Sequence, residues 1–176
     1  AAALADRRRE VARESEEVLA SAAWAEELDR IETAALGGPW RETPAGREPA
    51  WHAVSHGLDS WWWDLTAAWQ DLAALSPHQR HRVRITAKKL RYLTELTADL
   101  YADREGERAS SSAGFKEVQD HLGEMQDRVA GAALVRDHGF RPASLDAAAD
   151  AAALTRVVAV ACRLESHPPY WRARSE

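Results

Sequence analysis

The stretch PHQRHRVRITAKKLRY, residues 77–92, is the part of the sequence that best predicts the fold. It contains six Lys or Arg, two His and no acidic residue, in a chain of 176 residues with a formal net charge of −5. Ser76 precedes Pro77 and is followed three residues later by Gln79, which is a capping-box arrangement at a helix start. We therefore predict a helix that begins at Pro77 and ends near Ala102.

One face of this predicted helix is basic. At about 100° per residue, four of its side chains fall within an arc of roughly 80°. These side chains belong to His81, Arg84, Lys88 and Arg91. Like charges three and four residues apart destabilise a helix, so helix stability does not account for the arrangement. A polyanion that neutralises the charges would account for it, and the alternative is a solvated basic face that binds nothing.

Neighbouring residues add to this basic face. Arg82 and Lys89, seven residues apart, form a second basic edge. Tyr92 lies on the same face as the four side chains and has a hydroxyl that can donate to an anion. Glu95 follows Arg91 by four residues and can hold its guanidinium in place.

Most of the remaining chain is also predicted to be helical. Ala, Leu, Glu and Arg are abundant, only nine Gly and seven Pro occur, and no segment alternates polar and apolar residues for long. The predicted helices cover residues 4–36, 50–75, 77–102, 115–138 and 145–165, with Ser144 as the cap of the last and loops at 39–49 and 103–114. These elements predict an all-α fold, an antiparallel helical bundle of about four to five helices.

The length of the chain suits one domain with a core. We expect a single domain over residues 1–176, with a connector helix at 4–36, a bundle at 50–165 that carries the basic helix, and a tail at 166–176. The chain begins AAALADRRRE without Met, so we expect a fragment of a longer protein or a processed product.

Cysteine usage and hydropathy indicate the compartment. The single Cys excludes an internal disulfide and favours a reducing cytoplasm. Cys162 lies among Ala and Val, where a small buried thiol is expected. No apolar run approaches the roughly 20 residues of a membrane-spanning helix, and no signal peptide is visible, so we expect no membrane partner.

The predicted helix at residues 115–138 has two distinct faces. Its apolar face consists of Val118, Leu122, Met125 and Val129, and its other face of Lys116, Gln119, Asp120, Gly123 and Asp127. Gly123 costs a helix about 1 kcal/mol relative to Ala, so we expect it to permit close helix–helix approach. We expect Asp120 and Asp127 to anchor the cations of the basic helix. The two carboxylates could instead hold a metal or act as acid and base, but no His or third carboxylate stands at a useful spacing.

The predicted helix at residues 50–75 contains five of the eight tryptophans. Three of them, residues 61–63, cover most of a helix circumference, so we expect at least one indole to be partly exposed. Such tryptophans are more often core or interface anchors than platforms for nucleic-acid bases. If they mark an interface, its occupant is a missing N-terminal half-domain or a second copy of the chain.

The sequence HRVRITAKKLRYLTEL, followed by FKEVQDHLGEMQDRV, resembles the CHAD family, the conserved histidine α-helical domain. The family motif His-x-x-Arg-x-x-x-Lys-x-x-Arg-Tyr is matched by His81, Arg84, Lys88, Arg91 and Tyr92. The motif Leu-Gln-Asp-x-Leu-Gly-x-x-Asn-Asp is matched by Val118, Gln119, Asp120, Leu122, Gly123, Gln126 and Asp127, with Gln126 where Asn is usual. The resemblance covers about residues 4–165 as the C-terminal half of such a domain, because a complete member has an earlier copy of the basic helix.

The resemblance implies an all-helical domain that binds inorganic polyphosphate through a basic surface groove. On the basis of this resemblance, the residues expected to bind polyphosphate are His81, Arg82, Arg84, Lys88, Lys89, Arg91, Tyr92 and Lys116. The residues expected to support them are Glu95, Gln119, Asp120, Gly123 and Asp127. An association with polyphosphate granules in the cytoplasm is the corresponding expectation.

We expect a binding module rather than an enzyme. No P-loop, His-Glu-x-x-His, nucleophile elbow or Cys/His metal spacing occurs, so no catalytic residue, metal or cofactor is expected. One alternative is a structural or scaffolding module that uses the Trp-rich helix to hold a partner protein. The other is nucleic-acid binding through the same basic face, although the acidic net charge does not favour that partner.

Overall fold

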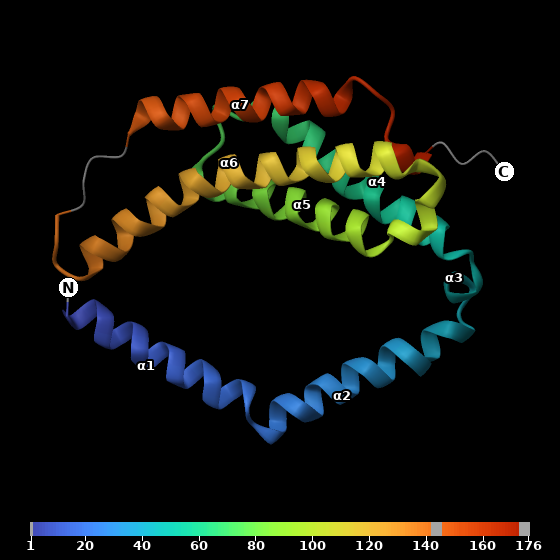
Figure 1. The fold of residues 1–176 in the computed structure, drawn as a ribbon, viewed down its shortest axis with the longest axis horizontal. Coiled ribbons are helices and arrows are strands. Elements are labelled where there is room, and N and C mark those ends of the chain that lie inside the picture. Colours follow the sequence, from blue (N-terminus) through green and yellow to red (C-terminus); the bar gives the residue numbers. More distant parts are fainter. Residues whose placement is uncertain (1, 142–145, 173–176) are drawn as a thin grey trace. The chain divides into compact units, whose positions relative to one another are not determined.

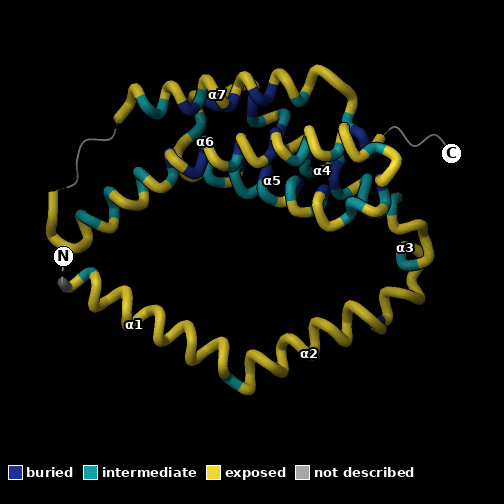
Figure 2. The backbone as a smooth tube through the Cα atoms, in the orientation of Figure 1, coloured by how far each residue is buried: buried dark blue, intermediate teal, exposed yellow. Residues whose placement is uncertain are grey.

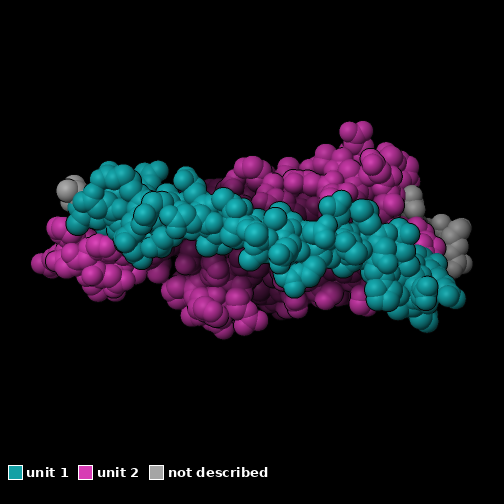
Figure 3. Space-filling model, turned by 90° about the horizontal axis from the view of Figure 1, so that it is seen from below, with its two compact units in different colours: residues 1–48 teal, residues 49–176 magenta. Residues whose placement is uncertain are grey.

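The computed structural model describes residues 2–141 and 146–172 of the chain. The chain divides into two compact units, residues 1–48 and residues 49–176, which Figure 3 shows in separate colours. Both units are built from helices, and the described residues contain no strand. The prediction of an all-α fold is confirmed.

The first unit consists of helices and short turns. Its elements are α1 (Ala2–Leu19), α2 (Ala22–Gly37), a 3-10 turn (Pro39–Glu42) and the short helix α3 (Pro44–Arg47). The prediction of one continuous helix over residues 4–36 is wrong, because the helix is interrupted between α1 and α2 (Figure 1). The hydroxyl of Ser21 accepts a hydrogen bond from the amide of Trp24 at 3.2 Å. This N-cap starts a new helix at the break.

Within the described residues, the second unit is a bundle of four long helices. Its elements are α4 (Ala50–Trp69), α5 (Pro77–Leu96), a 3-10 segment (Ala98–Arg104), α6 (Glu105–Asp137), α7 (Ala147–Glu165) and a 3-10 turn (Tyr170–Arg172). Helix α6 packs on both α5 and α7, and α4 packs on α5 (Figure 1). The predicted bundle is confirmed. None of the described helices combines the length and the apolar character that crossing a bilayer requires.

Helix α6 begins earlier than the sequence indicated. The sequence predicts a polar loop at residues 103–114, but most of this segment is the first part of α6. Serine hydroxyls can be accommodated in a helix when they find an acceptor nearby. Ser111 donates to the carbonyl of Glu107 at 2.9 Å, and Ser112 donates to Oε1 of Glu95 at 3.0 Å.

Apolar residues at helical spacing form the core of the second unit. Figure 2 shows the buried residues concentrated in α4 to α7, whereas α1 and α2 are coloured almost entirely as exposed. The core residues are Leu58, Trp62, Leu65 and Trp69 of α4, Val83, Ala87 and Leu90 of α5, Phe115, Val118, Leu122 and Met125 of α6, and Ala153, Val157, Val160 and Ala161 of α7. Three of the four residues of the predicted apolar face, Val118, Leu122 and Met125, are therefore part of the core, whereas Val129 is half-buried.

The tryptophans of α4 divide between core and surface. Trp62 and Trp69 are buried, Trp61 is half-buried, and Trp63 is 62% exposed. The prediction that at least one indole of residues 61–63 is partly exposed is confirmed.

The segment predicted as a tail, residues 166–176, contributes two aromatic residues to the core. Tyr170 and Trp171 are 1% and 2% exposed. The hydroxyl of Tyr170 donates to Oγ1 of Thr94 at 3.2 Å, and Nε1 of Trp171 donates to Oδ1 of Asp59 at 2.7 Å. The prediction of a tail is wrong because two aromatic side chains bury their rings at the end of the bundle and find polar partners on α5 and α4.

Two further predictions concern α7. Ser144 and residue 145 lie outside the described residues, and α7 begins just after Asp146, whose carboxylate accepts a hydrogen bond from the amide of Ala149 at 3.0 Å. Cys162 is exposed, so the prediction of a buried thiol is wrong. Its neighbour Ala161 is buried, and one step of about 100° around the helix turns the next side chain toward solvent.

Candidate functional site

The basic segment forms helix α5, and the predicted capping box is present at its start. The hydroxyl of Ser76 accepts a hydrogen bond from the amide of Gln79 at 3.3 Å, and the side chain of Gln79 accepts one from the amide of Ser76 at 2.8 Å. The predicted end near residue 102 is wrong, because α5 ends at Leu96 and a 3-10 segment follows.

Part of the basic face of α5 lies along its contact with α6. Arg84 lies against Gly123, and Arg91, two turns further along α5, contacts Gln119, which comes earlier in α6. The two helices therefore run antiparallel. The two motifs, which are separated in the sequence, meet in the bundle.

Gly123 makes room for the side chain of Arg84. A Cβ at position 123 would lie 3.1 Å from Nε of Arg84 and 3.6 Å from its Nη2. We expected Gly123 to permit close helix–helix approach, and the group that comes close is a guanidinium. Arg84 is half-buried, and its Nε has no hydrogen-bond partner among the described residues.

Arg91 is held by residues of both α5 and α6. Its side chain is 17% exposed. Its Nε donates to Oε1 of Gln119 at 3.2 Å, and its Nη1 donates to Oε1 of Glu95 at 3.2 Å. The hydroxyl of Ser112 donates to the same carboxylate. The predicted pair of Arg91 and Glu95 is present, whereas Ser112 was missed because its segment was predicted as a loop.

Tyr92 contacts two of the cations. Its ring centroid lies 5.4 Å from Nζ of Lys88 and 4.3 Å from Cζ of Arg91. Cation–π contacts of this kind orient long side chains over the ring. Because Tyr92 is 48% exposed, the three residues present a hydroxyl and two positive charges close together at the surface.

Arg82 and Lys89, the predicted second edge, lie away from α6. Both side chains are exposed, and Nζ of Lys89 lies 5.4 Å from the ring centroid of Trp61 on α4. The basic residues therefore spread around the outward side of α5, from α6 on one side to α4 on the other. The groove that the family resemblance implies stays a prediction.

Most cations of α5 have no acidic partner in the part of the chain that the structure describes. Arg82, Arg84, Lys88 and Lys89 form no ion pair with a described residue, and the single acid of α5, Glu95, is paired with Arg91. Three arginines elsewhere in the second unit are each paired with an acid: Arg128 with Asp150, Arg156 with Glu124, and Arg163 with Glu117. Positive charge is thus concentrated on α5 in a chain that is acidic overall, which creates a local positive potential.

The carboxylates of α6 do not make the predicted contacts with the cations of α5. Nζ of Lys116 donates to Oδ2 of Asp120 at 2.5 Å on the same exposed face of α6. Asp127 forms no ion pair within the described residues. The observed contacts therefore do not include the predicted anchoring of α5 cations by Asp120 and Asp127. No set of three His, Cys, Asp or Glu side chains in the described ranges is placed to hold a metal ion.

His81 stands at the N-terminal end of the basic face. It is half-buried, and its Nδ1 is buried without a hydrogen-bond partner among the described residues. It lines a cavity of about 20 Å³ together with Gln126 of α6 and Asp150 of α7. A space of this size holds about one water molecule.

These features define an all-α bundle in which one helix presents a row of cations, most of them without an acidic partner among the described residues, and packs on a glycine-bearing partner helix. The chain belongs to the CHAD domain family, whose model matches residues 1–136. We expected the family likeness to extend to residue 165, but the match ends before α7, although α7 supplies part of the core. Searches of the curated proteins and of the solved structures gave no match.

Proposed function

We propose that this chain is a non-enzymatic module that binds inorganic polyphosphate through the basic face of α5. The CHAD family, to which the chain belongs, is associated with polyphosphate binding. The observation that carries the proposal is the row of cations on α5 that have no acidic partner within the described residues. A linear polyanion supplies the missing negative charges at several points along one helix.

Each basic residue has a part in this proposal. Arg84, Lys88, Arg91 and Lys116 contact non-bridging phosphate oxygens through charge-assisted hydrogen bonds. Arg91 can do so while it stays bound to Gln119 and Glu95, because a guanidinium has five N–H donors. His81 and Tyr92 add directional hydrogen bonds. Arg82 and Lys89 extend the contact for a longer chain.

Binding of this kind depends on salt. Each phosphate that is neutralised by Lys or Arg releases condensed counterions, so the affinity falls as the salt concentration rises. The net charge of −5 weakens long-range attraction but leaves the local contact intact. We expect little selectivity for chain length above the length that spans α5.

Thermal unfolding with long-chain polyphosphate tests the proposal. A ligand that binds only the folded state stabilises it by about 2.7 kcal/mol at 100 times its Kd, so the Tm should rise. The double variant Arg82→Ala/Lys88→Ala should lose most of that rise. Neither side chain forms an ion pair with a described residue, so their removal leaves no acid without its partner.

A second double variant, Arg136→Ala/Arg141→Ala, removes the same charge from the end of α6 and from the segment after it, where neither arginine forms an ion pair with a described residue, and it should keep the rise in Tm. Equal loss in both double variants would show a general charge effect and contradict a site on α5. If duplex DNA or RNA displaces polyphosphate at equal phosphate concentration, the basic face is a nucleic-acid site. Association that persists at high salt without polyphosphate would instead favour a scaffold based on the Trp-rich helix.

A further inference from the structure

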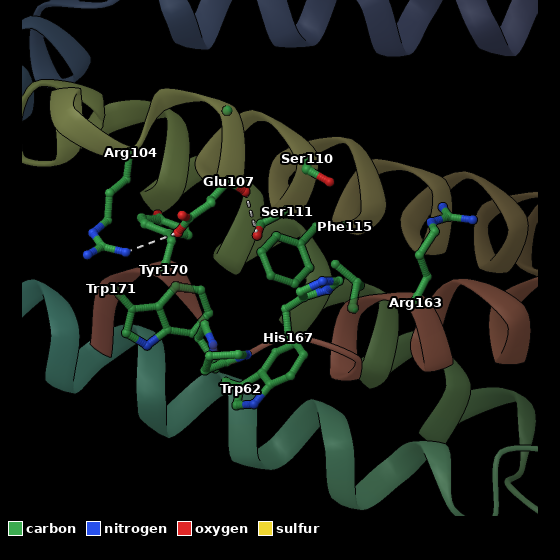
Figure 4. A pocket seen from close by; sticks show the side chains of 14 residues that line it. Trp62, Arg104, Glu107, Ser110, Ser111, Phe115, Arg163, His167, Tyr170 and Trp171 are labelled. Atoms are coloured by element: carbon green, nitrogen blue, oxygen red, sulfur yellow. Dashed lines mark hydrogen bonds and ion pairs between the residues drawn. The ribbon is translucent and has the colours of Figure 1, made fainter. Parts of the chain in front are cut away.

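The exposed apolar surface of the chain is concentrated in the first unit. In the second unit, a cavity of about 510 Å³ lies between α6, α7 and the C-terminal 3-10 turn (Figure 4), but the four aromatic residues that line it are buried. Both of its arginines, Arg104 and Arg163, form ion pairs with acids. More than half of the exposed large apolar side chains in the described ranges belong to the first unit, although it is the smaller of the two units.

Helix α2 carries an apolar stripe that faces solvent. The stripe consists of Trp24, Leu28, Ile31 and Ala35, which are separated in turn by four, three and four residues. Its three large side chains are 39–55% exposed, and none of the described side chains of α1 or α2 is buried. This spacing is typical of the seam between two helices that pack side by side. Because most of the stability of a helix in a protein comes from the packing of its apolar face, the stripe calls for a partner.

Helix α1 carries a stripe of the same spacing that contains one charge. It consists of Leu4, Arg8, Val11, Ser15 and Val18. The hydroxyl of Ser15 donates to the carbonyl of Val11 at 2.8 Å, so it is satisfied within the helix. Arg8 is exposed and forms no ion pair with a described residue, whereas the other three arginines of α1 are paired with acids of their own helix. A single polar residue in such a seam specifies the register of the partner, so a helix that covers α1 needs an acid close to Arg8.

A second copy of the chain can supply that acid. When two copies lie antiparallel, the stripe of α1 meets the stripe of α2 in one register, with Leu4 opposite Ala35, Arg8 opposite Ile31, Val11 opposite Leu28 and Ser15 opposite Trp24. Glu32 follows Ile31 on the flank of the stripe of α2. It is exposed and forms no ion pair with a described residue, so it is available to Arg8.

This register favours pairing between two copies over closure within one copy. Its midpoint falls between Leu19, the last residue of α1, and Ala20. For α1 to fold onto its own α2 in this register, the chain would have to reverse at that point and unwind the last turn of α1. Two copies can pass each other there with both helices intact, so that each α1 covers the α2 of the other copy. The resulting interface is two-fold symmetric, as in most dimers.

The two helix pairs bury enough area for a dimer of modest affinity. At 1.5 Å per residue, α1 and α2 are each about 25 Å long, and a helix contact is about 10 Å wide. Two helix pairs then bury on the order of 1,000 Å² in total, which is the lower limit for a specific interface. Glu14 and Glu27 come near each other at the edge of the seam, but Glu27 is already bound by Arg30.

We propose that the first unit is a dimerisation unit. The apolar stripes of α1 and α2 pack on those of a second copy, and Arg8 forms an ion pair with Glu32 of the partner subunit. The proposal does not depend on polyphosphate binding.

Sedimentation equilibrium of the full chain, without polyphosphate, tests this proposal. The chain should pass from monomer to dimer between about 1 and 100 µM. Arg8→Glu brings two acids together and should weaken the dimer about tenfold or more. The double variant Arg8→Glu/Glu32→Arg reverses the pair and should restore the dimer. Arg13→Glu makes the same change on the opposite side of α1 and is the matched control, which should keep the wild-type Kd.

A chain that stays monomeric at every concentration would overturn the proposal. So would equal weakening by Arg8→Glu and Arg13→Glu, or a double variant that does not restore the dimer. Trp63→Ala, on α4, should leave the dimer unchanged, and its loss in that variant would place the association on the Trp-rich helix instead. Near-UV circular dichroism of the buried tryptophans of the second unit checks that each variant is folded.

Discussion

The guanidinium of Arg84 lies over Gly123, so close that a Cβ at position 123 would be 3.1 Å from its Nε. The contact joins the two motif helices at a position of α6 that has no side chain. This contact explains how the basic helix α5 can pack on α6 although α6 does not place an acidic side chain opposite each cation.

Gly123→Ala should change the position of Arg84 more than it changes stability. Alanine favours the helix by about 1 kcal/mol, and displacement of the guanidinium by a few tenths of an ångström offsets part of this gain. We expect the free energy of unfolding to stay within about 1 kcal/mol of wild type in urea titrations, while polyphosphate binding weakens severalfold. Gly131→Ala, at a position with open space, should stabilise the chain without affecting binding.

The pair of Arg91 and Gln119 should contribute measurably to stability. Arg91 is 17% exposed, and its Nε donates to Gln119 across the contact between α5 and α6. A double-mutant cycle with alanine at both positions should give a coupling energy of about 1 kcal/mol. The same cycle on Lys116 and Asp120, an exposed pair four residues apart, should give about 0.5 kcal/mol or less. Equal coupling in both cycles would contradict this account.

Trp171 and Trp63 should respond to truncation in opposite ways. Trp171 is 2% exposed and donates a hydrogen bond to Asp59, so Trp171→Ala should lower the free energy of unfolding by about 3–5 kcal/mol. Trp63 is largely exposed, and Trp63→Ala should cost less than about 1 kcal/mol. Urea titrations of both variants measure the difference. Similar values would show that the C-terminal turn is not part of the core.

The free energy of unfolding should fall at alkaline pH because the hydroxyl of Tyr170 is buried in the folded state. Burial raises the pKa of the Tyr170 hydroxyl above its ordinary value of 10.0, and the hydrogen bond to Thr94 only partly opposes this. Above about pH 10 the unfolded chain therefore loses this proton while the folded chain keeps it. Because the unfolded state then binds fewer protons, the free energy of unfolding falls as the pH rises. Below about pH 10, the stabilising contribution of the Tyr170 hydroxyl to the free energy of unfolding is fully present.

Tyr170→Phe should remove the part of the alkaline loss of stability that comes from this hydroxyl. At neutral pH the variant should cost about 1 kcal/mol, because the hydrogen bond to Thr94 is gone. Urea titrations at pH 7 and at about pH 11 compare the wild type with this variant. An unchanged alkaline slope in Tyr170→Phe would contradict the assignment.

The sequence predicted the parts of the fold that depend on neighbours along the chain. The capping box of Ser76 and Gln79, the apolar spacing of the 115–138 segment and the row of cations on α5 all follow from local helix geometry. Local rules also caused the errors. Three consecutive serines indicated a loop where α6 begins, and a run of helix-forming residues hid the break at Ser21.

By itself, the sequence determined an all-α chain, a basic helix and the motif residues that connect it to its family, because these depend on residue identity and on spacing within a helix. Only the tertiary structure decided that Arg84 packs on Gly123 and that Tyr170 and Trp171 are core residues. Each of these depends on contacts between residues far apart in the chain, and such contacts are set by the packing of whole helices.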